Sequence, residues 1–164
     1  MNRITEREER ASSGPGRESS EQRVLSASPD GKTGSSVEAV LRKRIDDLAQ
    51  AIRDKNIEQL LAFYAPDVVV FDLRPPLDTR GAEAYRKNFE RWFGAFEGPL
   101  WFELKDLRIV PGEGAAFCHY LSEVTGKPQG ARETSYWIRG TSCFERRDGE
   151  WLITHEHISV PKEM

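Results

Sequence analysis

The sequence is poor in the features that mark several large classes of protein. It has only two cysteines, Cys118 and Cys143, among 164 residues, and no apolar signal-peptide core precedes them, so a disulfide scaffold is excluded. No stretch approaches the ~20 apolar residues that a bilayer-spanning helix needs. The net charge is −3, with no clustered basic face, which removes the electrostatic footprint of a nucleic-acid-binding protein.

Motifs of nucleotide chemistry are missing too. The chain has no Gly-rich phosphate loop, no Ser nucleophile elbow and no Cys-based metal spacing,. We therefore expect a cytoplasmic protein that binds a small molecule, without a cofactor or a metal ion, and without nucleic-acid or membrane partners.

Composition changes abruptly near Val37. Residues 1–36 contain no aromatic side chain and are rich in Ser, Gly, Pro and charged residues, so they bury too little apolar surface to offset the entropy of ordering. All the aromatic side chains lie beyond this segment. The sequence thus predicts a disordered tail over 1–36 and one compact domain over 37–164.

Hydrophobic spacing predicts the elements of this domain. Apolar residues three and four apart predict a helix over 37–52, a shorter one over 57–64 and a third over about 79–98, and a β-branched run predicts a strand at 68–71,. From residue 100 the period changes to two, which predicts strands at 100–110, 115–124, 133–146 and 150–160, the last two joined by a tight turn at Asp148-Gly149,. This order predicts an α+β fold, with the helices packed on one face of a curved antiparallel sheet that closes over a cavity.

Two segments carry a resemblance to a known group of proteins. They are the run Tyr64-Ala65-Pro66-Asp67 leading through Val68 to Phe71 and Asp72, and the run Arg146-Arg147-Asp148-Gly149-Glu150-Trp151 followed by His155, His157 and Ser159. With the order of elements, they resemble the nuclear transport factor 2-like superfamily, and within it the SnoaL-like and ketosteroid isomerase-like proteins, over about residues 37–161. The resemblance implies a cone-shaped domain and a homodimer formed through the convex face of the sheet.

The resemblance also suggests roles for individual positions. It places Asp72 where ketosteroid isomerase has its general base, whereas Leu48 stands where that enzyme has its oxyanion-hole tyrosine, which argues against steroid isomerisation. The terminal hairpin resembles the association domain of calcium/calmodulin-dependent protein kinase II, but Ser142 and Ile158 stand where that domain places cavity arginines. A carboxylate-binding cavity of that domain's kind is therefore not indicated.

Three titratable residues are candidates for acid–base chemistry. Asp72 follows an apolar strand and precedes a proline-stiffened loop, which can hold a carboxylate at a cavity mouth as a base, although loop amides could equally satisfy it. His119 lies in an apolar strand with Glu123 on the same face, so it is either the partner acid or a core histidine. Glu156 is the third candidate, as a second carboxylate.

The orientation of the last strand stays open at the level of sequence. His155, His157 and Ser159 share one face and Thr154, Glu156 and Ile158 the other, and both faces carry apolar residues, so alternation does not decide unless a bulge intervenes,. Alignment to the association domain favours the second face, in which case Asp72, His119 and Glu156 converge. If instead the histidine face points inward, His119 would complete a three-histidine metal site.

The substrate-binding candidates also carry alternatives. If the odd-numbered face of the third long strand points inward, Arg139 becomes an anion clamp and Trp137 a stacking platform; if outward, both belong to a dimer interface. The full set of substrate-binding candidates is Tyr85, Phe89, Trp92, Trp137, Arg139, Phe144 and His157. The leading hypothesis is an isomerase, cyclase or hydrolase that transfers a proton on a small, mostly apolar, oxygenated substrate. The alternative is a non-catalytic ligand-binding or assembly module.

Overall fold

The computed structural model describes residues 31–161, which fold into helices and strands in the predicted order except for one added strand, β2, at Thr79–Arg80, where the third helix was predicted to begin. The elements are α1 (Gly31–Arg53), α2 (Ile57–Leu61), β1 (Tyr64–Phe71), β2 (Thr79–Arg80), α3 (Ala82–Gly94), β3 (Phe96–Val110), β4 (Ala115–Pro128), β5 (Thr134–Arg147) and β6 (Glu150–Ser159). The α+β class is confirmed. Of the disordered tail predicted over residues 1–36, residues 1–30 lie outside the described residues, whereas residues 31–36 form the start of α1 and correct that part of the prediction.

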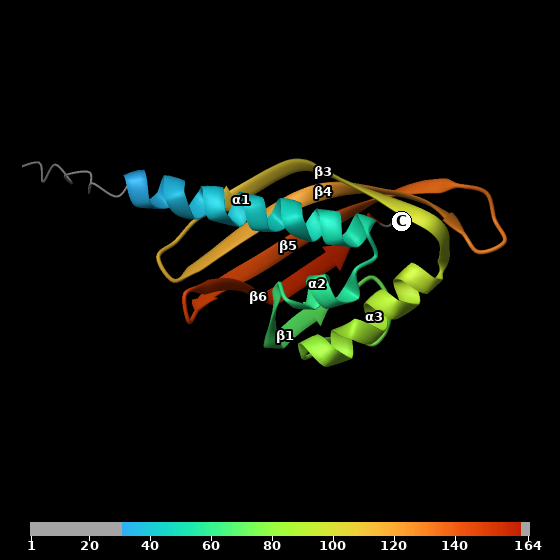
Figure 1. Ribbon diagram of the computed structural model, residues 1–164, viewed down its shortest axis with the longest axis horizontal. Coiled ribbons are helices and arrows are strands. Elements are labelled where there is room, and N and C mark those ends of the chain that lie inside the picture. Colours follow the sequence, from blue (N-terminus) through green and yellow to red (C-terminus); the bar gives the residue numbers. More distant parts are fainter. Residues whose placement is uncertain (1–30, 162–164) are drawn as a thin grey trace, which may run out of the picture.

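The sheet is mixed rather than antiparallel throughout. Its strand order is β2-β1-β6-β5-β4-β3, and β3 to β6 form the predicted antiparallel meander. β1, however, pairs with β6 in parallel. Parallel neighbours need a long connection, and here it runs through α3 and the strands β3 to β5,. Figure 1 shows the helices on one side of the curved sheet, with α1 running along β3 and α3 across the end that holds β1.

The helices form where apolar residues repeat on one side. α1 buries Leu41, Ile45, Leu48 and Ile52 at three- and four-residue spacing,. It begins at Gly31, earlier than predicted, because the residues before Val37 carry no apolar pattern that could signal a helix. α3 buries Tyr85, Phe89 and Phe93, three side chains at four-residue spacing.

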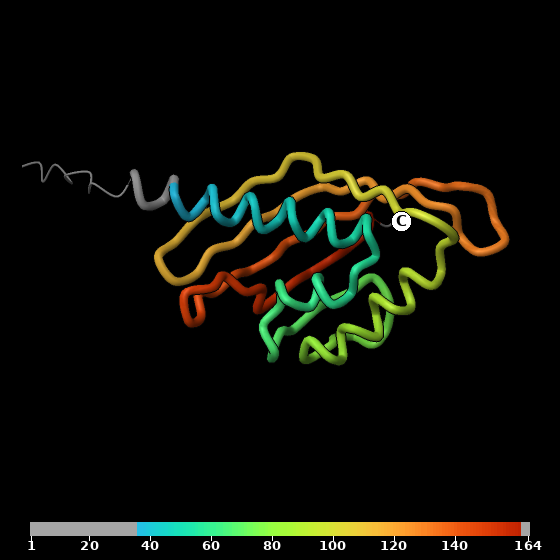
Figure 2. The backbone as a smooth tube through the Cα atoms, viewed as in Figure 1, coloured from blue at the N-terminus to red at the C-terminus, as the bar shows by residue number. Residues whose placement is uncertain are grey.

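β1, β3 and β4 are longer than predicted, and irregularities interrupt the pairing of the strands. β1 begins at Tyr64, so the residues predicted to end the second helix start a strand instead; the backbone N–H of Ile153 donates to Phe63 O at 2.9 Å and ties this segment to β6. The pairing of β3 with β4 shifts register twice, once on each side of Phe102, and Asp106 has a positive φ of 51°. Such bulges bend a strand, and Figure 2 shows the long hairpins of the meander curving past the helices.

No helix among residues 31–161 combines the length and apolar character needed to cross a lipid bilayer.

Candidate functional site

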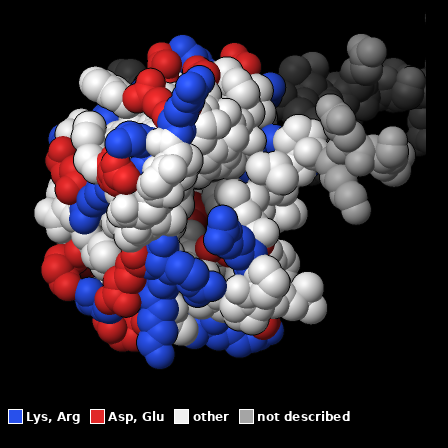
Figure 3. Space-filling view, turned by 90° about the vertical axis from the view of Figure 1, so that its right-hand side faces the viewer, with Lys and Arg blue, Asp and Glu red and all other residues white. Residues whose placement is uncertain are grey.

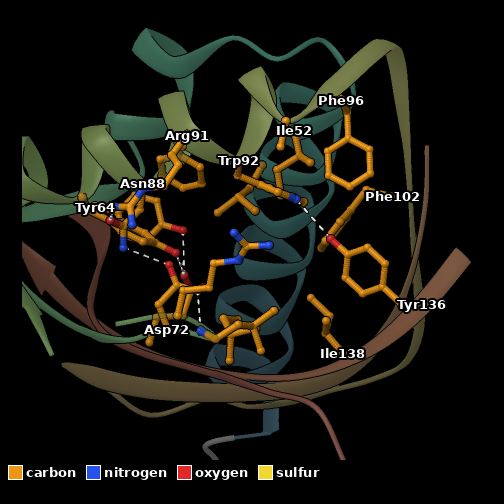
Figure 4. Close-up of a pocket in the computed structure, with 18 of the residues that line it drawn as sticks. Ile52, Tyr64, Asp72, Asn88, Arg91, Trp92, Phe96, Phe102, Tyr136 and Ile138 are labelled. Carbon is orange, nitrogen blue, oxygen red and sulfur yellow. Dashed lines mark hydrogen bonds between the residues drawn. The ribbon is translucent and has the colours of Figure 1, made fainter. Parts of the chain in front are cut away.

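A cavity of about 240 Å³ lies between the inner face of the sheet and helices α1 and α3. Its walls are mainly apolar and aromatic; those labelled in Figure 4 include Ile52, Trp92, Phe96, Phe102 and Ile138. Figure 3 shows a hollow in one end of the molecule, with acidic side chains in its depth and basic side chains beside it. An apolar pocket with a few convergent polar groups is the usual form of a small-molecule site.

Glu156 is the most deeply buried polar group of this cavity. Its side chain, on β6, is 3% exposed. The hydroxyls of Tyr64 and Tyr85 donate to Oε2 at 2.9 and 3.2 Å, and the Ser142 hydroxyl donates to Oε1 at 2.9 Å. These donors come from β1, α3 and β5, so the carboxylate joins three parts of the fold and both of its oxygens have partners.

Burial dominates the electrostatics of Glu156. The loss of water raises the pKa of this carboxyl, and the nearby charge of Asp72 raises it further, whereas the hydrogen bonds from Tyr64, Ser142 and Tyr85 oppose the rise. Burial and the charge of Glu156 also raise the pKa values of Tyr64 and Tyr85 well above the usual range, so both hydroxyls keep their protons and remain donors,.

Asp72 lies half-buried where β1 ends and contributes a second carboxylate to the cavity. Its Oδ1 accepts from the backbone N–H of Leu73 at 2.6 Å, and its Oδ2 accepts from the Asn88 amide on α3 at 2.9 Å. Arg91 in turn donates to Asn88 Oδ1 at 2.9 Å. A neutral amide, rather than a cation, therefore holds Asp72 in place.

Tyr136, on β5, carries the hydroxyl on the far side of the cavity from Asp72 (Figure 4). The Trp92 indole N–H donates to the Tyr136 oxygen at 3.1 Å. Because an indole nitrogen only donates, the phenol proton points elsewhere, and within residues 31–161 it has no acceptor. Burial raises the pKa of Tyr136, which the Trp92 hydrogen bond and the charge of Arg74 partly offset. Tyr136 thus offers the cavity a donor.

Two backbone features aim side chains into the cavity. The register of β5 and β6 shifts between Cys143 and Phe144, so that Ile153 and Glu156 both face inward although they differ in parity,. Gly140 lies opposite Tyr120 on β4. A methyl group at Gly140 would overlap the Tyr120 ring, so only glycine leaves room for this phenol to lie flat over β5,.

The structure brings five of the predicted site residues together and separates the others. Asp72, Tyr85, Phe89, Trp92 and Glu156 line the cavity. In β6 the side chains of Trp151 and Ile153, before the register shift, face inward, so the odd-numbered face is the inner one there. After the shift Glu156 faces inward, as the even-numbered alternative predicts.

The predicted convergence of His119 with Asp72 and Glu156 is wrong. In β4 the buried positions are the even-numbered ones, including Cys118 and Tyr120, so the odd-numbered His119 lies on the outer face and is exposed,.

Four further predictions of placement need correction. Trp137 and Arg139 lie on the outer face of β5, which is the alternative that the sequence left open, and His157 is exposed on the outer face of β6. Phe144 is buried in the core and does not line the cavity. The inward face was misjudged for His157 and the depth for Phe144, whereas for Trp137 and Arg139 the outward alternative holds.

Sequence reasoning missed Tyr64, Ser142, Asn88, Tyr136 and Arg74. Tyr64 was placed on a helix, and Ser142 was noticed only as a departure from another domain's arginine. The alternation of β5 does carry a signal, because Tyr136, Ile138 and Ser142 share one face; however, Trp137 and Arg139 on the other face are equally typical of a binding site.

The histidines do not form the metal site considered as an alternative. All three lie towards the outer face, where His155 Nδ1 donates to the Val69 carbonyl at 2.8 Å and the rings of His155 and His157 contact the edge of Phe71. In the part of the chain that the structure describes, no group of three or more His, Cys, Asp or Glu side chains is arranged to hold a metal ion.

Comparison with known proteins finds a family model and solved structures that this chain resembles. The model of the SnoaL-like domain matches residues 41–163. No curated protein matches the chain. Among solved structures, an NTF2-like protein of unknown function from Pseudomonas putida KT2440 is 32% identical with a TM-score of 0.72, over 79% of this chain and 90% of the other.

Two more distant structures share the fold alone. A candidate scytalone dehydratase from Novosphingobium aromaticivorans is 18% identical, with a TM-score of 0.68 over 77% of this chain and 86% of its own. The association domain of C. elegans CaMKII is 16% identical, with a TM-score of 0.63 over 79% of this chain and 99% of its own.

Proposed function

Because the chain belongs to the SnoaL-like family, we propose that its cavity binds a small, mostly apolar, oxygenated molecule and transfers a proton on it. One observation carries the proposal: a carboxylate, Asp72, and an unpaired phenol donor, Tyr136, lie on facing sides of an otherwise apolar cavity. A base and a hydrogen-bond donor held apart in this way act on two positions of one bound molecule.

Each group has a separate task in this reaction. Asp72 takes a proton from the substrate, and the Tyr136 hydroxyl donates a hydrogen bond to the substrate oxygen on which negative charge develops. The apolar walls exclude water, which strengthens both interactions. Asp72 then returns the proton to another atom of the same molecule, which completes an isomerisation or a cyclisation; a hydrolysis would use the same pair with water.

Glu156 supports this chemistry as a second carboxylate. Its raised pKa lets it hold or release a proton at a higher pH than an exposed glutamate does,. Its hydrogen bonds fix Tyr64 and Tyr85, which form one end of the cavity. The volume of about 240 Å³ lies just below the usual range of about 300–1,000 Å³ for ligand pockets. A substrate of one or two rings fits this size better than a larger one.

The proposal is tested by deuterium exchange into a panel of small cyclic and aromatic ketones in D₂O, followed by NMR. We expect the wild-type protein to catalyse exchange, and Asp72→Asn to slow it by about 10²–10⁴-fold, the usual contribution of a positioned base. Asp78→Asn is the matched control, since Asp78 lies in the same loop but pairs with Arg80 at 2.7 Å. Exchange that persists unchanged in Asp72→Asn would refute the role of Asp72.

A non-catalytic binding module is the second candidate. Leu48 lines the cavity at the position where the resemblance would put a donor, and the hydroxyls of Tyr64 and Tyr85 are already bonded to Glu156. A cavity short of free donors binds a ligand but stabilises developing charge poorly. Ligand binding without any exchange that depends on Asp72 would favour this reading.

We further propose that the outer face of the sheet joins two copies of the chain. Phe117, Leu121 and Trp137 are 42%, 37% and 45% exposed there, and the adjoining register rows carry acidic residues, Glu103 and Glu123, and basic residues, Lys105 and Arg139. A face with both charges around apolar residues is self-complementary about a two-fold axis. Sedimentation should give a dimer, and Leu121→Glu a monomer.

We also propose that the protein is located in the cytoplasm. This location is supported by the two free thiols, Cys118 and Cys143, because unpaired cysteines are usual in a reducing compartment. Fractionation of cells that express the chain would test it.

A further inference from the structure

Arg74 is a cavity-lining cation without a protein partner. It follows Asp72 in the loop at the cavity mouth and is exposed on one side. Within residues 31–161 its guanidinium makes no ion pair or hydrogen bond, although its neighbours in the chain do: Arg80 pairs with Asp78 at 2.7 Å, and Arg86 pairs with Glu58 and Glu83.

Asp72 does not neutralise this cation. The oxygens of Asp72 are held by the Leu73 N–H and the Asn88 amide at 2.6 and 2.9 Å, and in the described chain no ion pair links Asp72 to Arg74. The other cavity arginine, Arg91, already donates to Asn88. The Arg74 guanidinium at the cavity mouth therefore has no partner among residues 31–161, although the Asp72 carboxylate lies in the same loop.

The charge of Arg74 also acts across the cavity. It lowers the pKa of Tyr136, against the larger upward effect of burial, so the guanidinium and the phenol are close enough to interact electrostatically. Both groups are donors, and an oxygen-rich group of a ligand can reach both. Asp72 repels an anion placed against it whereas Arg74 attracts one, so an anionic ligand would place its charge on the guanidinium.

We propose that the ligand of this cavity is a small aromatic or alicyclic carboxylic acid whose carboxylate pairs with Arg74. This inference rests on the proposed function, because it assigns the substrate class of the same cavity. The planar guanidinium matches a carboxylate with two parallel hydrogen bonds. Trp92, Phe96 and Phe102 supply flat apolar contacts for the ring. The pairing fixes which end of the molecule faces Asp72.

The test compares two probes of nearly equal shape, phenylacetate and its neutral counterpart phenylacetamide, in calorimetric or NMR titrations. We expect the wild-type protein to bind the carboxylate about tenfold or more tightly than the amide, the scale of one charge-assisted bidentate contact. Arg74→Gln should remove this preference while still binding the amide, and Arg74→Lys should keep part of it. Arg132→Gln is the control, because Arg132 is exposed in the loop between β4 and β5 and does not line the cavity.

The outcomes separate this inference from the proposed function. Equal affinities for the two probes, a preference that survives Arg74→Gln, or no measurable binding of phenylacetate would each overturn it. Asp72→Asn should slow deuterium exchange by the same factor of about 10²–10⁴ yet keep or enhance the carboxylate preference, since it removes a like charge. If exchange depends on Asp72 but the preference is absent, the substrate class is wrong and the proton transfer stands; a preference without exchange leaves a carboxylate-binding module.

Discussion

The inner and outer faces of the sheet are built from alternate residues of the same strands, yet they differ in how their polar groups are satisfied. On the inner face the carboxylate of Glu156 receives three hydroxyl hydrogen bonds and the Tyr136 oxygen receives an indole hydrogen bond. On the outer face Phe117, Leu121 and Trp137 are exposed, and His119 between them is exposed as well.

Apolar content therefore does not tell the two faces apart. Both faces of β4 and β5 carry aromatic and aliphatic side chains, so a hydrophobic pattern fits either orientation,. What distinguishes the inner face is a buried hydrogen-bond network, in which hydroxyls from three other elements donate to Glu156,. Substitutions on the inner face should therefore lower the free energy of unfolding or the rate of exchange. Substitutions of the neighbouring residues on the outer face should change both only slightly.

The largest effect on stability is expected from Glu156→Leu. The change leaves the hydroxyls of Tyr64, Tyr85 and Ser142 without their acceptor, and an unsatisfied buried polar group costs about 1–3 kcal/mol, so we expect a loss of roughly 3 kcal/mol in the free energy of unfolding. His157→Leu, one residue further on the outer face, should change it by less than about 0.5 kcal/mol. Denaturant titrations of both variants measure the contrast, and equal losses would contradict it.

A smaller loss is expected from Gly140→Ala. The added methyl group meets the Tyr120 ring, which must leave its rotamer or push the strands apart; such overpacking costs about 1–3 kcal/mol. Gly114→Ala provides the control, because a methyl group there meets nothing within 4 Å. Thermal unfolding compares the two, and a tolerated Gly140→Ala would mean that Tyr120 is not packed against β5.

The pH dependence of stability should also single out the inner face. Burial raises the pKa of Glu156 in the folded protein, so between the ordinary glutamate value and this raised value the folded state binds more protons than the unfolded chain. The free energy of unfolding therefore falls as pH rises through that window, and levels off above it. Glu156→Gln should lack this slope. Parallel curves for the two proteins between pH 4 and 8 would show that Glu156 does not titrate abnormally.

Much of the fold could be predicted because its signals are local. The apolar spacing of α1 and α3, the alternation of the long strands and the Asp148-Gly149 turn each specify one element, and the motif residues from Tyr64 to Asp72 led to the family that the comparison confirms. The parallel pairing of β1 with β6 was missed because it joins segments more than eighty residues apart and has no local signature.

The site was predictable only in part. Asp72 and Glu156 were found from their positions at or within strands, whereas the inward orientation of Glu156 depends on a bulge that alternation does not reveal,. Tyr136 and Asn88 belong to the site because of partners on other elements: Trp92 donates to Tyr136, and Asn88 donates to Asp72. Such pairs exist only once the fold has formed, so a scan of single residues passes over them.

The smallest effect is expected where the sequence predicted a catalytic partner. His119 lies in register with Arg108 and Thr141 on the outer face, while its neighbour Tyr120 points into the cavity. His119→Ala should therefore leave deuterium exchange within about twofold of wild type and stability within about 0.5 kcal/mol. Tyr120→Leu, one residue away, should alter both, because it changes the cavity wall and removes a buried ring. A loss of exchange in His119→Ala as large as that in Asp72→Asn would reverse the assignment of the two faces, because the chemistry would then depend on a side chain that the cavity does not contain.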